Sequence, residues 1–221
     1  MTPLQTLDSE TTPAENLADW LQRNSRLVGT GAVLVVVAGA GYWFFLRSAE
    51  IKRVNAERGL NQAKQSLAAG NAALAATDLQ RVTTRYRGTP AGGQAAMLLA
   101  QLHYEQARFA EGVQVLEAYQ NPRTARADLS AVWSLTADGQ TAQGQLDQAA
   151  ESYRKAAESA AMPGARALFL AKSARTLMAA GKNAEARAVW ESLVDDPDAA
   201  VVQNEARIRL GELMAQPAGR S

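Results

Sequence analysis

Few side chains in this sequence could support catalysis or bind a metal. The only histidine is His103, and there is no cysteine. A single imidazole cannot make a zinc site, and no pairing of a nucleophile with a base is apparent in the sequence. Asp195, Asp196 and Asp198 form an acidic cluster, but Pro197 divides it and its spacing is not that of a calcium-binding loop. We therefore expect His103 to be a structural residue and the acidic cluster to be a loop and helix start.

Glycine patterns and charge exclude two further classes of site. No G-x-x-x-x-G-K-[ST] sequence occurs, and the pairs Gly29/Gly31 and Gly39/Gly41 lie inside an apolar run that no strand precedes. The formal net charge of +1 is too small for the electrostatic footprint of a nucleic-acid-binding domain. The apolar run also lacks a histidine that could ligate haem. The sequence predicts no enzyme, no cofactor or metal, and no nucleic-acid partner.

The apolar run predicts one transmembrane helix, residues 27–46. These 20 residues carry no charge, and a helix of that length spans roughly 30 Å, the thickness of a hydrocarbon core. Arg26 and Arg47 flank the run, and the aromatic residues at 42–45 stand where a belt of aromatic side chains meets the membrane surface. A cleaved signal peptide is the competing interpretation. The long acidic tail before the run and the absence of an A-x-A cleavage site argue against it.

The orientation of this helix stays open on the sequence alone. Two basic residues precede it, whereas Arg47, Lys52, Arg53 and Arg58 follow it, which favours a cytoplasmic C-terminal domain. Long domains, however, cross membranes largely regardless of such charges.

Two features at the N-terminal end could bind a partner or lipid. In the tail, residues 1–26, Thr12 begins a capping box, and Leu17, Trp20 and Leu21 then fall on one face of a short amphipathic helix. This helix would lie on the membrane surface, or it would simply fray into the membrane helix. Within residues 27–46, Gly31 and Gly39 belong to a set of small residues that could let a second helix approach closely. Ordinary tolerance of glycine in a membrane helix is the alternative.

A repeat of 37 residues dominates the remainder of the chain, where good helix formers abound and no strand pattern appears. Four positions recur at this period. A turn residue recurs at Gly70, Ala107, Gly144 and Gly181; a small residue at Ala75, Gly112, Ala149 and Ala186; a large apolar residue at Leu79, Leu116, Tyr153 and Trp190; and an alanine at Ala63, Ala100, Ala137 and Ala174, followed by Gly211.

These positions resemble the tetratricopeptide repeat, a helix, a turn and a second helix with small residues where the helices cross. The resemblance implies an all-α fold: a single transmembrane helix, a connector at residues 47–57, and at residues 58–215 an α-solenoid of about four hairpins with a C-terminal capping helix. Residues 216–221 form a tail. Trp133 and Trp190 occupy positions of core packing. Stacked hairpins would leave a concave protein-binding surface lined by exposed residues of the first helices. The candidates are Gln101, Glu105, Gln106 and Gln140.

The order of these parts resembles the YfgM-like family, an ancillary subunit of the bacterial Sec translocon. The similarity runs through Gly41-Tyr42-Trp43, residues 98–101 and residues 184–191. It implies a single-pass protein of the bacterial inner membrane, with periplasmic repeats that contact the translocon and chaperones. A second hypothesis is a structural subunit of a large respiratory or photosynthetic membrane complex that stabilises its neighbours. Both imply other membrane-complex subunits and the lipid bilayer as partners.

Overall fold

The computed structural model describes residues 24–121 and 128–215, and within these ranges the secondary structure is entirely helical. The helices are α2 (Ser25–Ala68), α3 (Ala72–Arg85), α4 (Pro90–Glu105), α5 (Phe109–Glu117), α6 (Leu129–Ala142), α7 (Leu146–Ser159), α8 (Pro163–Ala179), α9 (Asn183–Asp195), the 3₁₀ turn η1 (Pro197–Ala199) and α10 (Gln203–Ala215). The prediction of an all-α solenoid is confirmed. The chain divides into two compact units, residues 1–51 and 52–221, which are described separately.

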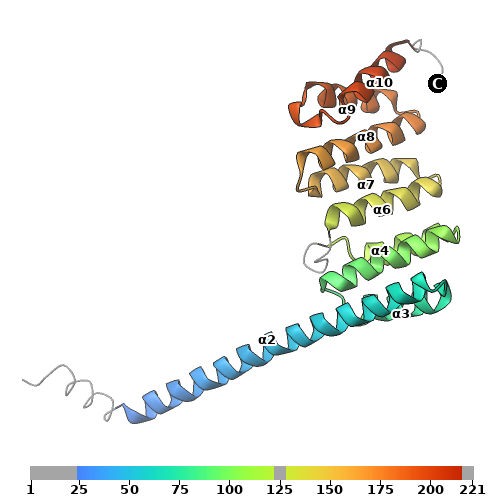
Figure 1. Ribbon diagram of the computed structural model, residues 1–221. Coiled ribbons are helices and arrows are strands. Elements are labelled where there is room, and N and C mark those ends of the chain that lie inside the picture. The colour runs from blue at the N-terminus through green and yellow to red at the C-terminus, as the bar shows by residue number, and fades with distance from the viewer. Residues whose placement is uncertain (1–23, 122–127, 216–221) are drawn as a thin grey trace, which may run out of the picture. The chain divides into compact units, whose positions relative to one another are not determined.

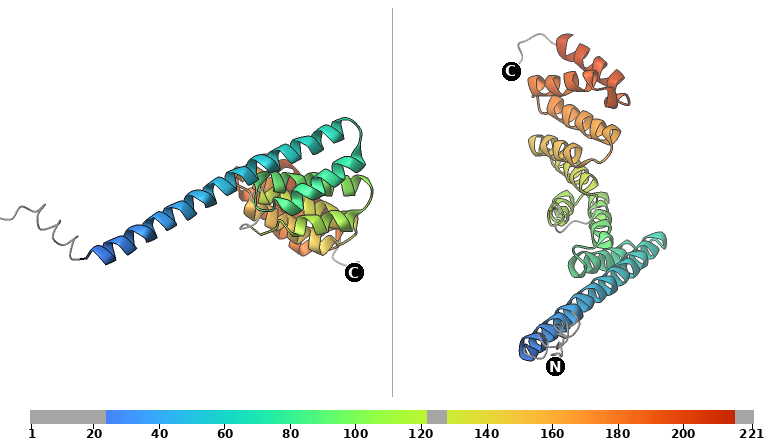
Figure 2. Two further views of the ribbon diagram at one scale, coloured as in Figure 1. Left: turned by 90° about the horizontal axis from the view of Figure 1, so that it is seen from below. Right: turned by 90° about the vertical axis from the view of Figure 1, so that its left-hand side faces the viewer.

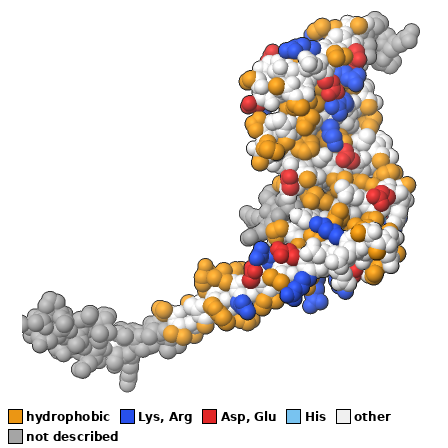
Figure 3. Space-filling model, viewed as in Figure 1, with side chains coloured by type: hydrophobic (Ala, Val, Ile, Leu, Met, Phe, Trp, Pro, Cys, Tyr) orange, Lys and Arg blue, Asp and Glu red, His pale blue; other side chains and the backbone are white. Residues whose placement is uncertain are grey.

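The first unit contains the apolar part of α2. From Leu34 to Leu46 the side chains are exposed or nearly so, and the large ones are between 49% and 72% exposed. Figure 3 shows these apolar side chains gathered along the helix. Among the described residues, only this helix has the length and composition that crossing a membrane requires. A signal sequence near the N-terminus would meet the same two criteria.

The second unit is a stack of helical hairpins that follow one another in sequence order (Figure 1). The C-terminal part of α2 pairs with α3, α4 with α5, α6 with α7, and α8 with α9. We call α2, α4, α6 and α8 the first helices of their hairpins, and α3, α5, α7 and α9 the second helices. The right-hand view in Figure 2 shows the same succession up to α10, after which the described residues contain no second helix.

The same type of turn joins the two helices in each of the four hairpins. In the third, the Gly144 amide donates to the Thr141 carbonyl and the Gln145 amide to the Gln140 carbonyl, which is the Schellman arrangement. Its turn residue needs a positive φ, and Gly70, Gly144 and Gly181 have φ of 74° to 76°. The remaining turn has Ala107 at φ 56°, where an L side chain crowds the backbone. Sequence spacing therefore located all four turns.

The recurring small and apolar positions make up the core. Ala63, Ala100, Ala137 and Ala174 are each 0% exposed, and the small residues of the second helices are buried as well. The large apolar residues four positions later are buried too, and Trp190 is 0% exposed. Because alanine or glycine stands on both helices of each hairpin, their backbones can approach closely. Trp133, the other tryptophan expected in the core, is only partly buried.

The second unit begins a few residues before the predicted repeat boundary. Residues 47–57 continue the α-helix without interruption, and Ala56 is already fully buried against the first hairpin. The connector expected at 47–57 is thus helical. Gly59 explains how tightly this helix packs, because a Cβ there would lie 2.8 Å from Val82 Cγ2 of α3.

Replacing Ala107 by glycine should stabilise the second hairpin. Ala107 is exposed, so the substitution loses no packing, and glycine adopts positive φ without the steric penalty of a Cβ. We expect the free energy of unfolding of Ala107→Gly to rise by about 1 kcal/mol in urea denaturation. Ala142→Gly, at an exposed position in the last turn of α6, should instead lower it by about 1 kcal/mol. Equal effects of the two substitutions would contradict the turn assignment.

Candidate protein-interaction surfaces

Polar side chains occupy the same repeat position on successive first helices and together form a row. Successive 37-residue steps lead from Lys64 through Gln101, Asp138 and Arg175 to Glu212. All of them are exposed or partly exposed, and the Asp138 side chain is 42% exposed. We call the side of the stack that carries this row the first-helix face.

Ion pairs connect this row over the C-terminal helices. Arg175 of α8 donates two hydrogen bonds to Glu205 of α10, at 2.6 and 2.9 Å, and Arg209 donates to Glu212 at 2.8 Å. The hydrogen bonds from Arg175 lower the pKa of Glu205, and the same contact raises the pKa of Arg175. Acidic and basic side chains alternate over this part of the surface (Figure 3). A partner would therefore meet a face of mixed charge.

Asp138 is the centre of a smaller cluster on α6, α7 and α8. The Tyr153 hydroxyl donates to its carboxylate, and the Lys172 ammonium lies 3.3 Å from it. Lys172 Nζ is also 5.1 Å from the centre of the Tyr153 ring. Burial raises the pKa of the Tyr153 hydroxyl, and the hydrogen bond to Asp138 raises it further. The phenol therefore stays a neutral donor, and Asp138 is held in place.

Grooves lie between successive second helices at three places in residues 24–121 and 128–215. The first, of about 420 Å³, lies between α3 and α5; the second, of about 240 Å³, between α5 and α7; and the third, of about 340 Å³, between α7 and α9. The end of the intervening first helix contributes His103, Gln140 and Leu177 in turn, which stand 37 residues apart. The grooves therefore repeat with the hairpins, while their chemistry changes.

The middle and last grooves differ in polarity. The middle groove is lined by glutamines, with Gln114 and Gln148 among them, whereas Leu170, Leu177 and Val189 give the last groove an apolar side. Glu185 and the ion pair between Lys182 and Asp147 (3.0 Å) lie at the last groove.

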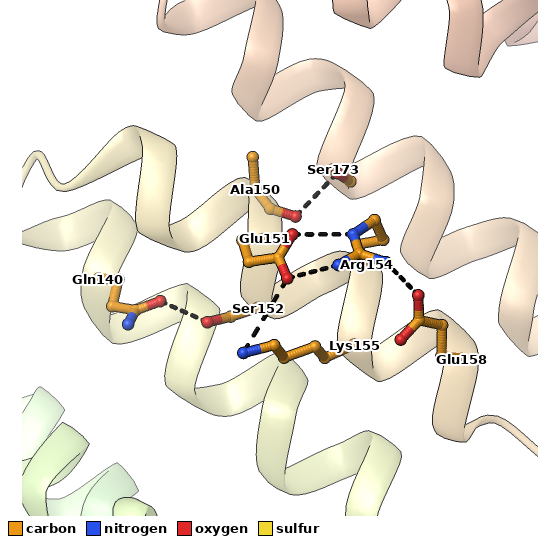
Figure 4. Close-up of polar contacts among 8 residues, drawn as sticks. All are labelled: Gln140, Ala150, Glu151, Ser152, Arg154, Lys155, Glu158 and Ser173. Atoms are coloured by element: carbon orange, nitrogen blue, oxygen red, sulfur yellow. Dashed lines mark hydrogen bonds and ion pairs between the residues drawn. The ribbon is translucent and has the colours of Figure 1, made fainter.

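A network of hydrogen bonds and ion pairs runs along α7 at these grooves (Figure 4). Arg154 donates to both carboxylate oxygens of Glu151, at 2.8 and 2.5 Å, and pairs with Glu158 on its other side. The Ser152 hydroxyl donates to the Gln140 side chain at 2.7 Å, and the Ser173 hydroxyl donates to the Ala150 carbonyl at 2.8 Å. These last two bonds tie α7 to the first helices on either side. The hydrogen bond from Arg154 lowers the pKa of Glu151.

The structure separates the residues predicted to line the binding surface. Gln101 and Glu105 are exposed one helical turn apart on α4, and Gln101 belongs to the first-helix face. Gln106 caps the end of α4, where its side chain accepts a hydrogen bond from Arg108. Gln140 stands two residues after Asp138, about 200° further round the helix, and it lines the middle groove. The four residues therefore do not form one surface.

The residues predicted to contact lipid or a neighbouring membrane helix belong to the N-terminal tail and to α2. Leu17, Trp20 and Leu21 lie outside the described residues. Gly31 lies within helix α2, and Gly39 is exposed with no side chain near the position of its missing Cβ. Asp196 of the acidic cluster accepts a hydrogen bond from the Asp198 amide at the start of η1, as expected of a helix start.

Sequence reasoning missed the packing of Tyr104. Its ring lies against Gly112 of α5 and Gly139 of α6, where a Cβ on either glycine would overlap it. Its hydroxyl donates to the Leu135 carbonyl at 3.0 Å, and burial raises its pKa. Gly112 belonged to the recurring pattern, but nothing in the sequence marked Gly139.

This stack of hairpins, each closed by the same turn and the same small residues, defines an α-solenoid of the tetratricopeptide type. The chain belongs to the tetratricopeptide repeat-like domain family, whose sequence pattern matches residues 18–160. The match ends at α7, but the 37-residue period continues through α8, α9 and α10. Families with this repeat are typically non-catalytic scaffolds that bind other proteins.

Solved structures show a similar architecture at low sequence identity. Nearly identical TPR-like repeats assigned to a kinesin light chain of Podosopora anserina are 16% identical, with a TM-score of 0.48, covering 74% of this chain and 97% of that one. A single-substitution variant of those repeats is 18% identical, with a TM-score of 0.48 and coverages of 73% and 93%. No curated protein shows significant similarity to this chain.

His103 should make the second hairpin sensitive to mild acid. Its Nδ1 is buried without a hydrogen-bond partner among the described residues. Burial lowers its pKa below 6.5 and Arg108 adds to this, while Glu111, 3.6 Å away, opposes it less strongly. The unfolded state then binds more protons than the folded state as the pH falls through 6.5, so stability decreases. We expect the free energy of unfolding of the full-length protein to fall between pH 7.5 and pH 5.5.

Two variants test whether His103 causes this pH dependence. His103→Gln places the residue found at the equivalent position 140, and because His103 is the only histidine it should flatten this pH dependence. Glu111→Gln removes the carboxylate that favours the charged imidazole, so it should steepen the dependence. An unchanged slope in His103→Gln would refute the assignment.

Proposed function

We propose that this protein is a membrane-anchored, non-enzymatic scaffold whose repeat unit binds other proteins. The observation that carries the proposal is the combination of a tetratricopeptide-type unit with a helix whose apolar residues are left exposed by the described part of the chain. In a soluble protein a contiguous apolar surface of this kind is rare, because its contact with water is unfavourable. In a bilayer the same side chains from Leu34 to Leu46 would be solvated by lipid.

We further propose that it serves as an ancillary subunit of the Sec translocon in the bacterial inner membrane, with its repeats in the periplasm near chaperones. The order of the apolar helix and the repeats, together with the resemblance to the YfgM-like family, supports this role. The alternative role, a structural subunit of another large membrane complex, is favoured by the small residues Gly39 and Gly41, which would let a neighbouring membrane helix approach.

A charge within the apolar helix should release the protein from membranes. We expect the wild type to stay with the membrane fraction after alkaline carbonate extraction and to keep its N-terminal residues, as intact mass would show. Val36→Arg combined with Val37→Arg should move a large part of it to the soluble fraction, because each arginine near the bilayer centre costs roughly 2.5–3.5 kcal/mol. Lys64→Arg serves as the control. Cleavage after the apolar run would instead establish a signal peptide.

Co-purification should identify the partners and the face that binds them. In mild detergent we expect the tagged protein to recover translocon subunits, and protease added to spheroplasts should digest the repeats. Gln101→Arg adds a charge to the first-helix face and should reduce this recovery severalfold. Gln114→Arg makes the same change at the grooves between second helices and should not.

Recovery of a different membrane complex would favour the alternative role. Protection of the repeats from protease would contradict the periplasmic orientation. A loss with Gln114→Arg but not with Gln101→Arg would assign binding to the grooves instead.

A further inference from the structure

Helix α10 is the first helix of a fifth hairpin that has no second helix among the described residues. In α8, Ala167, Ala171 and Ala174 form a stripe that is at most 1% exposed. The positions 37 residues later on α10 are Asn204, Ile208 and Gly211. All three are exposed, Ile208 by 63%, and nothing lies within 4 Å of a Cβ placed on Gly211. The surface that is buried on α8 in the preceding hairpin is therefore exposed on α10.

Large apolar side chains stand on this open surface beside the polar Asn204. An exposed helix face normally carries polar residues, because that face meets water. Here Val201 is 63% exposed and Met214 is 62% exposed, in addition to Ile208. The opposite side of the helix holds it in place, since Val202 and Ala206 are buried in the core with α8 and α9.

The complete hairpins indicate which residues would cover this surface. In each complete hairpin, the small residue of the first helix packs against a second helix that also carries a small residue. Four positions after that small residue, the second helix carries a large apolar residue. The residue equivalent to Met214 in the preceding hairpin is Leu177, which lines a groove together with Val189. Val189 stands three positions after the small residue Ala186. A covering helix therefore needs apolar residues three and four positions after its small residue.

A charge distinguishes α10 from the other first helices. Arg207 stands 74 residues after Trp133 and thus occupies the same position two hairpins on. In the third hairpin the Lys155 ammonium lies 4.6 Å from the centre of the Trp133 ring, and Lys155 follows the small residue Ala149 by six positions. A helix that covers α10 would hold its sixth residue near Arg207, where a carboxylate would pair with the guanidinium.

We propose that α10 binds one amphipathic helix of a partner protein, which completes the fifth hairpin in trans. The partner helix carries a small residue, apolar residues three and four positions later, the second of them large, and Asp or Glu six positions later. This inference rests on the proposed role in binding proteins, but it concerns a surface other than the first-helix face.

A second copy of α10 fits this surface less well. The residue four positions after Gly211 is Ala215, so α10 lacks the large apolar side chain that each second helix supplies. An antiparallel two-fold pairing that crosses at Gly211 would also bring Glu212 of both copies together, and like charges at such a contact are unfavourable.

The chain's own α9 supplies a probe for the test. The peptide of residues 183–195 has Ala186, Val189 and Trp190 at the required spacing, and Ser192→Glu adds the carboxylate. Labelled, acetylated and amidated, this peptide should bind full-length protein in detergent, as measured by fluorescence anisotropy. Gly211→Leu blocks the close approach at a position where an added Cβ has no atom within 4 Å, and it should weaken binding at least about tenfold.

Charge reversal at Arg207 gives a second, independent test of the proposed contact. Arg207→Glu should weaken binding of the Ser192→Glu peptide, and a Ser192→Lys peptide should restore it, whereas Arg166→Glu on α8 should have no effect. Binding that Gly211→Leu leaves unchanged would mean that the peptide displaces α9 instead, and would overturn the proposal. So would self-association of the protein that Gly211→Leu abolishes. If partners still co-purify but no peptide binds, only the role of α10 fails, not the scaffold function.

Discussion

The close crossing of two helices at small residues is the contact on which the repeat unit depends. Each complete hairpin places alanine on its first helix and alanine or glycine on its second, and all of them are buried. A larger side chain at Ala137 would hold α6 away from α7 and would open the contact on which the neighbouring hairpins pack. Because one hairpin cannot bury its own apolar surface, a wider crossing in one hairpin would also disturb the packing of the next hairpin. The alanine-rich composition thus follows from the geometry of the stack.

The residues that recur with the hairpins could be predicted from the sequence, and those fixed by one particular contact could not. The four turns require positive φ and the crossings require small side chains, so both appear as a residue type at a fixed period. The contact of Tyr104 with Gly139 joins positions 35 residues apart in only one hairpin pair, and no second instance exists to reveal it. Gln140 shows a different limit. Two residues along a helix turn a side chain to its opposite side, so Gln140 does not share the face of Gln101.

The ion pairs on the first-helix face contribute little to stability. Arg175 and Glu205 are 43% and 30% exposed, so water screens most of their attraction, and such pairs are worth only about 0–1 kcal/mol. Their paired geometry nevertheless fixes where each charge lies, and the alternation of sign leaves little net field. This face would select a partner by the positions of its charges and not by its overall charge.

The exposed apolar residues of α10 are not explained by the fold of this chain. Val202 and Ala206 already attach α10 to the preceding hairpin, so polar residues at 208 and 214 would cost no internal packing. Polar residues there would also remove the unfavourable contact of Ile208 and Met214 with water, each worth on the order of 1 kcal/mol. The open surface of α10 therefore has the composition of an interface. A solenoid grows by adding hairpins that each cover the one before. A helix from another protein would make the same contacts, but its binding must also offset the entropy lost on association.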